Sequence, residues 1–192
     1  MKKIIYTCPY VPAEWIAAHG LRPSRIIPDA AGPTGRAEGL CPFVQGFINE
    51  VMADTKAGGV VITTVCDQIR RVFDIFVQRC DVPLFLMNVP NTWQNVTVQK
   101  LYIDELKRLG RFLIGLGGKS PSDDALAKIM LDYDTARTTI LTAGGHLPAR
   151  QYAEIIAAFG RDGPSETFYD IALPDSKIKG VPLAILGGPL MR

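Results

Sequence analysis

Short apolar runs alternate with amphipathic stretches along the first half of the chain. Runs rich in apolar and β-branched residues predict strands, which span Lys3–Tyr6, Arg25–Pro28, Val60–Val65 and Pro83–Val89. Apolar residues at helical spacing predict helices, which span Pro12–His19, Pro42–Thr55 and Asp67–Arg79. Strands that alternate with helices in this way are typical of a parallel sheet. We therefore predict an α/β fold with a mostly parallel sheet and helices on both of its faces.

The rhythm changes after Pro90, where helical patterns follow one another without an intervening strand. They cover Thr97–Leu116, Ser122–Ala143 and Pro148–Phe159. A polar segment rich in Pro and Gly follows, and Val181–Leu186 then has the pattern of a buried strand. We expect an N-terminal α/β domain over residues 1–161, whose helical annex spans about 97–161. Residues 162–180 are then a linker, and 181–192 are the first strand of a truncated second α/β domain.

The composition is that of an ordinary globular protein and excludes two classes of partner. Of the 192 residues, 47% are hydrophobic and 21% are charged, and the formal net charge is +2. No basic stripe with interleaved aromatic residues indicates nucleic-acid binding. No apolar run approaches the roughly 20 residues of a membrane span, and the start of the chain does not read as a signal peptide. We expect a cytoplasmic protein that binds neither nucleic acid nor membrane.

The four cysteines carry most of the chemical information in the sequence. In a reducing compartment they are buried small residues, reactive thiols or metal ligands rather than disulfides. Cys8 follows the first predicted strand, Cys41 precedes a proline that can begin a helix, and Cys66 ends a buried strand. Strand-to-helix turns meet at the carboxyl edge of a parallel sheet, where α/β folds bind ligands. Cys80 ends a helix instead, so we predict that it lies at the opposite edge.

The spacing of these cysteines excludes the compact metal motifs. The sequence contains no Cys-x-x-Cys pair, so a zinc ribbon and a thioredoxin-like motif are excluded. The tight cysteine run of bacterial ferredoxins is also absent. Ligands that are far apart in sequence and gathered by the fold are still consistent with the pattern.

Motifs around three of the cysteines resemble those of one enzyme family. The segment CPYVPAE at residues 8–14, followed by AAHG at 17–20, resembles the first cysteine motif of the 2-hydroxyacyl-CoA dehydratase family. LCP at residues 40–42 matches the family's second cysteine motif, and TTVCDQIRR at 63–71 is similar to a third segment. The similarity continues to about Ala143, and Leu183–Pro189 resembles the strand that opens the family's second domain. Benzoyl-CoA reductase subunits and double-cubane-cluster reductases are relatives in this family.

The resemblance implies an iron–sulfur site and a candidate substrate-binding residue. By this resemblance Cys8 and Cys41 are ligands of a [4Fe–4S] cluster. The family's usual third ligand lies in the second domain, so Cys66 is a candidate third ligand here, as in the double-cubane relatives. The alternative for Cys66 is a small residue packed under the turn. Glu14 is a candidate substrate-binding residue, and the alternative is a carboxylate that only favours the dipole of its helix.

The function implied by the resemblance is one half of an iron–sulfur enzyme of anaerobic metabolism. An ATP-dependent iron–sulfur activator protein would deliver one electron to the cluster. The cluster would pass this electron to the carbonyl of an acyl-CoA thioester, which would become a ketyl radical anion. The reaction would be that of a 2-hydroxyacyl-CoA dehydratase, which is a lyase, or that of a benzoyl-CoA reductase. The alternatives are a double-cubane-type ATP-dependent reductase and an orphan or truncated domain without catalysis.

The resemblance also bears on assembly. We expect the isolated chain to be incomplete as an enzyme and to hold its cluster weakly. We expect it to associate with itself, with a second dehydratase subunit or with the missing C-terminal half. The resemblance assigns no catalytic residue.

One further segment has to be compared with a nucleotide-binding motif. Residues 117–120, GGKS, are similar to part of a phosphate-binding loop. That loop requires a glycine five residues before its Gly-Lys pair and a preceding strand. Here Leu113 occupies that position inside a predicted helix. We therefore predict that this segment ends a helix and binds no nucleotide.

Overall fold

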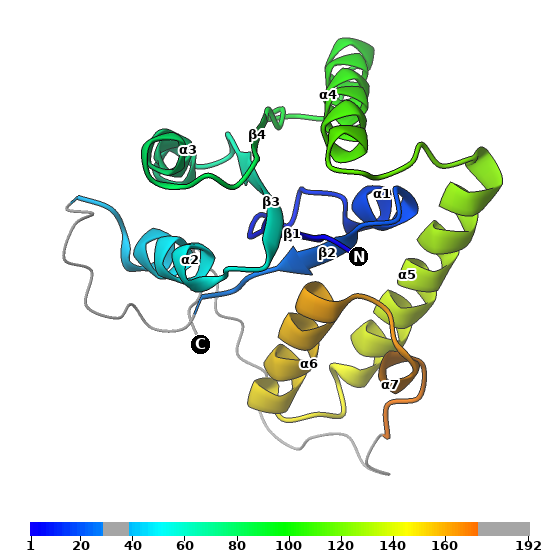
Figure 1. Ribbon diagram of the computed structural model, residues 1–192. Helices are drawn as coiled ribbons and strands as arrows, with labels where there is room; N and C mark the ends of the chain where they lie inside the picture. The colour runs from blue at the N-terminus through cyan, green and yellow to red at the C-terminus, as the bar shows by residue number, and fades with distance from the viewer. Residues whose placement is uncertain (29–38, 173–192) are drawn as a thin grey trace.

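The computed structural model of the protein describes residues 1–28 and 39–172, and its centre is a parallel sheet. The strands are β1 (Lys3–Tyr6), β2 (Arg22–Arg25), β3 (Ala57–Thr63) and β4 (Leu84–Met87), in the order β2-β1-β3-β4. All adjacent pairs are parallel, and helices lie on both sides of the sheet (Figure 1). The predicted α/β fold is confirmed.

The second strand is not where its apolar residues predict it. The expected strand was Arg25–Pro28, but β2 is Arg22–Arg25, and Lys3 to Tyr6 pair with these four residues in order. The ladder is set by the backbone of an edge strand, where Pro23 is tolerated because only one side of the strand needs hydrogen bonds. Ile26 then donates its N–H to the carbonyl of Tyr6 at 2.7 Å as the strand ends. The prediction was wrong because it relied on hydrophobic residues, whereas backbone pairing with β1 determines where β2 lies.

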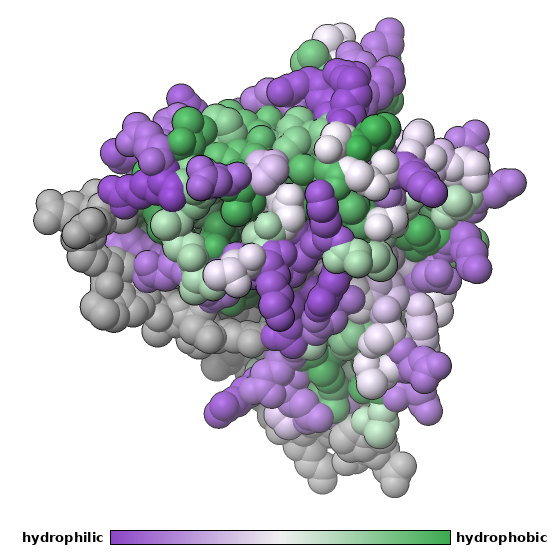
Figure 2. Space-filling view, viewed as in Figure 1, coloured by the Kyte–Doolittle hydropathy of each residue, from purple (hydrophilic) through white to green (hydrophobic). Residues whose placement is uncertain are grey.

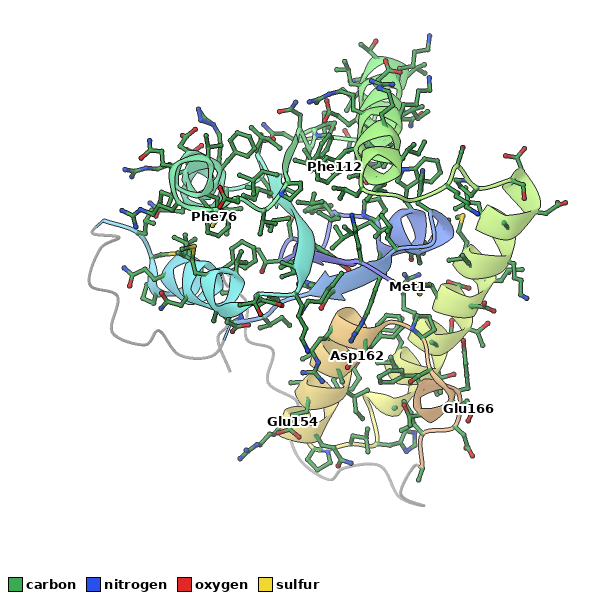
Figure 3. The ribbon with its side chains drawn as sticks, viewed as in Figure 1. Met1, Phe76, Phe112, Glu154, Asp162 and Glu166 are labelled. Carbon is green, nitrogen blue, oxygen red and sulfur yellow. The ribbon has the colours of Figure 1, made fainter. Side chains whose placement is uncertain are left out.

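Alternate residues of the central strands feed two separate cores. Ile4 and Tyr6 face a core with α1 (Ala13–Ala18) and α4 (Val96–Gly115), whereas Ile5 faces the opposite core. The opposite core is built with α2 (Pro42–Ala53) and α3 (Asp67–Arg79). Phe76 of α3 and Phe112 of α4 accordingly lie on opposite sides of the sheet (Figure 3). Strand side chains alternate between faces, so one strand anchors both layers.

Three helices that follow α4 share a small core of their own and are called the annex below, whereas α4, which the predicted annex included, packs on the sheet. Its helices are α5 (Asp123–Ala143), α6 (Ala149–Asp162) and α7 (Glu166–Tyr169). Helix α5 packs against α1 and α6 packs against β2, so the annex covers the β2 edge of the sheet (Figure 1). Helix α7 lies in the segment predicted as a linker, and its Phe168 is buried in the annex. The predicted strand Val181–Leu186 lies outside the described residues.

Strand β4 forms the other edge of the sheet, and α3 and α4 both pack against it. On the face shown in Figure 2, apolar side chains gather between α3 and α4, while the far end of α4 is hydrophilic. The sheet order places β4 at this edge. The two edges of the sheet therefore differ, and only the β2 edge carries the annex.

Gly117 and Gly118 end helix α4 in the hydrogen-bond pattern of a Schellman motif. Gly118 donates its N–H to the carbonyl of Leu113 at 3.0 Å, and Gly117 donates to Ile114 at 2.9 Å. Gly117 has a φ of +98°, in the left-handed region that favours glycine. These residues form a helix stop that follows a helix, which is not the strand–loop–helix setting of a phosphate-binding loop.

We expect Gly117→Ala to lower the free energy of unfolding by about 1 kcal/mol, because alanine is strained at positive φ. Gly115 is a matched control two residues away, since it is helical and a Cβ added there meets nothing within 4 Å. Gly115→Ala should be neutral or stabilising. Urea unfolding measures both variants. Equal effects at the two positions would contradict the Schellman assignment.

Glu105 of α4 joins the end of β4 to the helix. It accepts hydrogen bonds from the backbone N–H of Asn88 at 3.0 Å and from Arg108 at 2.5 Å. Burial alone would raise the pKa of Glu105, but these hydrogen bonds and the charge of Arg108 outweigh it and lower the pKa. A carboxylate whose pKa is lower in the folded state contributes stability above its unfolded pKa, and that stability disappears as the pH falls through the folded pKa.

We therefore expect Glu105→Gln to destabilise the protein by about 1 kcal/mol at pH 7, and we expect the difference from wild type to vanish at about pH 2. Urea unfolding across this pH range is the measurement. Glu154→Gln is the control, because Glu154 pairs with exposed Arg150 on the surface of α6. A difference that is constant with pH would contradict the role given to the Glu105 charge.

Candidate functional site

Three of the four cysteines lie where strands give way to helices at the carboxyl edge of the sheet. Cys8 follows the end of β1, Cys41 is the N-cap residue of α2, and Cys66 is the N-cap residue of α3 after the end of β3. Cys80 is the C-cap residue of α3, at the other end of that helix, and its thiol contacts Met52 near the end of α2. The structure thus places Cys80 at the opposite edge, as predicted. All four thiols are free.

The helix N-termini at this edge leave backbone donors without side-chain caps. Neither α2 nor α3 has a side-chain hydrogen bond at its N-cap, and both Cys41 and Cys66 are exposed. Gln68 accepts a hydrogen bond from the backbone N–H of Cys41 at 3.2 Å, which holds the two helix starts beside each other. Uncapped N–H groups and the partial positive charge of a helix start favour thiolates and bound anions.

The loop that carries Cys8 is fixed from both sides. The Thr7 hydroxyl donates to the carbonyl of Ile26 at 2.7 Å, and Arg25 Nε donates to the carbonyl of Thr7 at 3.0 Å. Beyond the cysteine, the Tyr102 hydroxyl of α4 donates to the carbonyl of Tyr10 at 3.1 Å. These bonds hold Cys8 half-buried on the first core without using its thiol.

The loop that carries Cys66 is held by the neighbouring strand. Thr64 donates its N–H to the carbonyl of Met87 at 3.1 Å, and its hydroxyl accepts from the N–H of Val89 at 3.2 Å. Thr64 of the TTVCD segment thus ties the β3 loop to the β4 loop. It helps to fix the position from which Cys66 begins α3.

The described residues do not by themselves complete a metal site. Among residues 1–28 and 39–172, no three side chains of His, Cys, Asp or Glu are grouped closely enough to hold a metal ion. The donors at the carboxyl edge are nevertheless free thiols next to helix starts, which is the donor type that iron–sulfur clusters use. The assignment of Cys8, Cys41 and Cys66 as ligands stays a prediction.

Glu14 lies at the wall of a cavity beside the Cys8 loop. It occupies the first turn of α1, as predicted, and forms an ion pair with Arg137 of α5. The cavity has a volume of about 300 Å³. Its wall includes charged and phenolic residues from the sheet, from α1 and from α5, namely Tyr6, Glu14, Arg25, Tyr133 and Arg137.

Sequence reasoning found only Glu14 among these residues. Arg137 is 123 positions from Glu14, and nothing in its local pattern marks it as a partner. Tyr133 reads as an ordinary core residue of α5. Arg25 was placed at the start of the second strand, whereas it is the last residue of β2, and its Nε donates to the carbonyl of Thr7.

The two buried tyrosines of the cavity are neutral hydrogen-bond donors. Burial raises the pKa of Tyr6, and the nearby Tyr133 and Glu14 raise it further, while Arg25 lowers it by less. Burial likewise raises the pKa of Tyr133, and Glu14 adds to the effect. Both hydroxyls therefore stay protonated at physiological pH and can donate to an anion.

Fold and site together define an α/β domain with cysteine thiols at the helix starts of its carboxyl edge. The sequence pattern of the 2-hydroxyglutaryl-CoA dehydratase D-component family matches residues 8–157, which is more than three quarters of the chain. The chain therefore belongs to the 2-hydroxyglutaryl-CoA dehydratase D-component family. The matched segment begins at Cys8 and includes all four cysteines and Glu14.

No curated protein sequence is similar enough to this chain to count as a match. Within the described residues, no helix combines the length and the hydrophobicity needed to cross a membrane.

Proposed function

We propose that the chain is a subunit, or the N-terminal part of a subunit, of a 2-hydroxyacyl-CoA dehydratase-like enzyme that binds an iron–sulfur cluster. The observation that carries the proposal is the set of free cysteines at the carboxyl edge, combined with membership of the family. Cysteine sulfur is the ligand type that iron–sulfur clusters use.

Cys8 and Cys41 are the proposed ligands of a [4Fe–4S] cluster, and Cys66 is the proposed third. The cluster, when bound, would supply the single electron that activates an acyl-CoA thioester. The hydrogen bond between Cys41 and Gln68 supports the role of Cys66, because it holds the starts of α2 and α3 together. Any further ligand would come from outside the described residues or from a partner chain.

The chain's own residues would position the thioester and exclude water from it. The loop after β1 is braced by Thr7, Arg25 and Tyr102, so Cys8 is held in place before any ligand binds. Glu14 adjoins the same loop, and its ion pair with Arg137 fixes its carboxylate toward the cavity. A substrate-binding role for Glu14 is therefore part of the proposal.

The proposed partners follow from this chemistry. They are an acyl-CoA thioester as substrate, an ATP-dependent iron–sulfur activator protein as electron donor, and a second dehydratase subunit or domain that closes the site. We also propose that the enzyme works in the cytoplasm, because its free thiols require a reducing compartment.

A second candidate function is a double-cubane-type ATP-dependent reductase. The exposed position of Cys66 at the start of α3, beside the start of α2, is the observation that favours it. This reading requires Cys66 as a ligand and twice the iron per chain. Because both candidates use Cys66, the iron content of the wild-type chain separates them, and a double-cubane cluster would give twice the iron of a [4Fe–4S] cluster.

The test of the proposed function is the response of the reduced, anaerobically reconstituted protein to acyl-CoA thioesters. We expect an electron paramagnetic resonance signal that changes when a 2-hydroxyacyl-CoA is added, and that does not change with free coenzyme A. A metal-loaded protein whose signal is the same with every thioester of a broad panel would contradict the proposed substrate class.

A further inference from the structure

The cavity beside β2 has a wall of two kinds. Charged and phenolic groups make up one part of it, and Tyr152 of α6 adds a further phenol. The rest is apolar and comes from the loop before α1 and from α5 and α6, namely Val11, Ile140, Leu141, Ile156 and Phe159. A volume of about 300 Å³ is at the small end of ligand pockets and suits a small metabolite.

Within the described residues, the charges of the wall leave one guanidinium without a carboxylate partner. Glu14 neutralises Arg137, which also lies 3.7 Å from Asp134. Arg25 forms no ion pair with a carboxylate of residues 1–28 or 39–172. Two arginines against one glutamate give the cavity wall a net positive charge. A buried or half-buried positive wall favours an anionic ligand.

Arg25 is held in one orientation by its surroundings. Its Nε donates to the carbonyl of Thr7 at 3.0 Å. The aliphatic part of its side chain lies across Gly160 of α6, where an added Cβ would meet it at 3.5 Å. With Nε engaged, the two terminal nitrogens are left as a planar pair of donors. A planar pair of this kind matches the two oxygens of a carboxylate.

Two tyrosine hydroxyls belong to the same cavity as Arg25. Tyr6, Arg25 and Tyr133 all line it, and the charge of Arg25 acts on Tyr6. Both phenols are neutral and can donate a hydrogen bond to an anion. Within the described residues, one guanidinium without a carboxylate partner and neutral donors suit a singly charged group better than a phosphate dianion. The apolar residues of the wall would contact a short hydrocarbon chain.

We propose that this cavity binds a small carboxylate with a short apolar chain, with its carboxylate on Arg25, Tyr6 and Tyr133 and its chain against α5 and α6. The proposal does not rest on the iron–sulfur assignment, because the site needs no metal. Since Thr7 both accepts from Arg25 and precedes Cys8, a ligand on Arg25 lies directly behind the cysteine loop. The carboxylate can belong to a free acid or to the end of an acyl group on coenzyme A.

Isothermal titration calorimetry on the metal-free, full-length protein tests the proposal. The probes are hexanoate, its neutral isostere hexanamide, glutarate, glutaryl-CoA, butyryl-CoA and inorganic phosphate. We expect hexanoate to bind at least about tenfold more tightly than hexanamide and phosphate, since the amide lacks the charge. Glutaryl-CoA binding more tightly than both glutarate and butyryl-CoA identifies an acyl thioester as the source. Hexanoate binding more tightly than both coenzyme A thioesters identifies a free acid, and either result supports the site. Butyryl-CoA binding more tightly than glutaryl-CoA and hexanoate would contradict it.

Arg25→Gln should weaken carboxylate binding at least about tenfold, through loss of a charge-assisted pair. Arg22→Gln is the matched control, because Arg22 lies on the same strand but pairs with Asp162 in solvent. It should leave binding unchanged. Circular dichroism shows whether each variant is folded.

Ile156→Trp provides a second test that leaves every charge in place. Ile156 is on α6 at the exposed part of the wall, so a larger side chain there fills the cavity. Binding should be lost in this variant. The proposal is overturned if no carboxylate binds, if hexanamide or phosphate binds as tightly as hexanoate, or if Ile156→Trp binds like wild type. Equal losses in Arg25→Gln and Arg22→Gln would also overturn it.

Discussion

Replacing Cys8 with serine is expected to remove most of the iron that the protein holds after anaerobic reconstitution, with a decrease of about tenfold or more. Serine keeps the size of the side chain but does not supply the thiolate that binds iron. The Cys8 loop is braced by Thr7, Arg25 and Tyr102 rather than by its thiol, so the fold should be kept. Iron per chain, measured by mass spectrometry, is the readout.

Cys80→Ser is the matched control for this change. Burial, with a smaller contribution from Asp81, raises the pKa of the Cys80 thiol, and the thiol lies at the other end of α3 from Cys66. Its replacement should leave the iron content at the wild-type level. If Cys80→Ser loses iron while Cys8→Ser keeps it, the carboxyl edge is not the metal site.

Replacing Phe76 with alanine is expected to lower the free energy of unfolding by about 3–5 kcal/mol. Phe76 is 0% exposed and packs in the second core, where its ring lies 6.2 Å from that of Phe47 on α2. Truncation would remove the contact between α2 and α3 and leave a cavity under the sheet. That loss is a large part of the roughly 5–15 kcal/mol that holds a domain together.

Val77→Ala on the same helix is the control for Phe76→Ala. Val77 is 59% exposed, so its change should stay within about 0.5 kcal/mol. Guanidinium unfolding compares the two variants. A loss in Phe76→Ala that is no larger than in Val77→Ala would show that α3 does not pack on the sheet as described. Because Cys66 is the N-cap residue of α3, the same measurement tests whether the packing of α3 holds that thiol in place.

Much of the central fold could be predicted from the sequence, because the local pattern of apolar residues determines those strands and helices. The strand Lys3–Tyr6 and the helix Asp67–Arg79 were predicted to the residue, since each combines a clear period with a clear boundary. The placement of Cys66 and Cys80 at opposite edges followed from the direction of a parallel strand–helix unit. These features depend on neighbours in sequence.

The parts that could not be predicted depend on distant residues. Strand β2 is polar, and only its pairing with β1 makes it a strand. The ion pair between Glu14 and Arg137 joins α1 to α5, and the cavity beside it takes its wall from five separate elements. No period or motif marks residues that meet only after the annex has folded onto the β2 edge.

The central claim is that the cysteines at the carboxyl edge hold an iron–sulfur cluster. Iron and acid-labile sulfide, measured per chain in wild-type protein purified without oxygen, test it most directly. The account predicts iron and sulfide in equal amounts, and a loss of both in the Cys8→Ser, Cys41→Ser double variant. Zinc in place of iron, or iron without sulfide, or a double variant that keeps both, would contradict it.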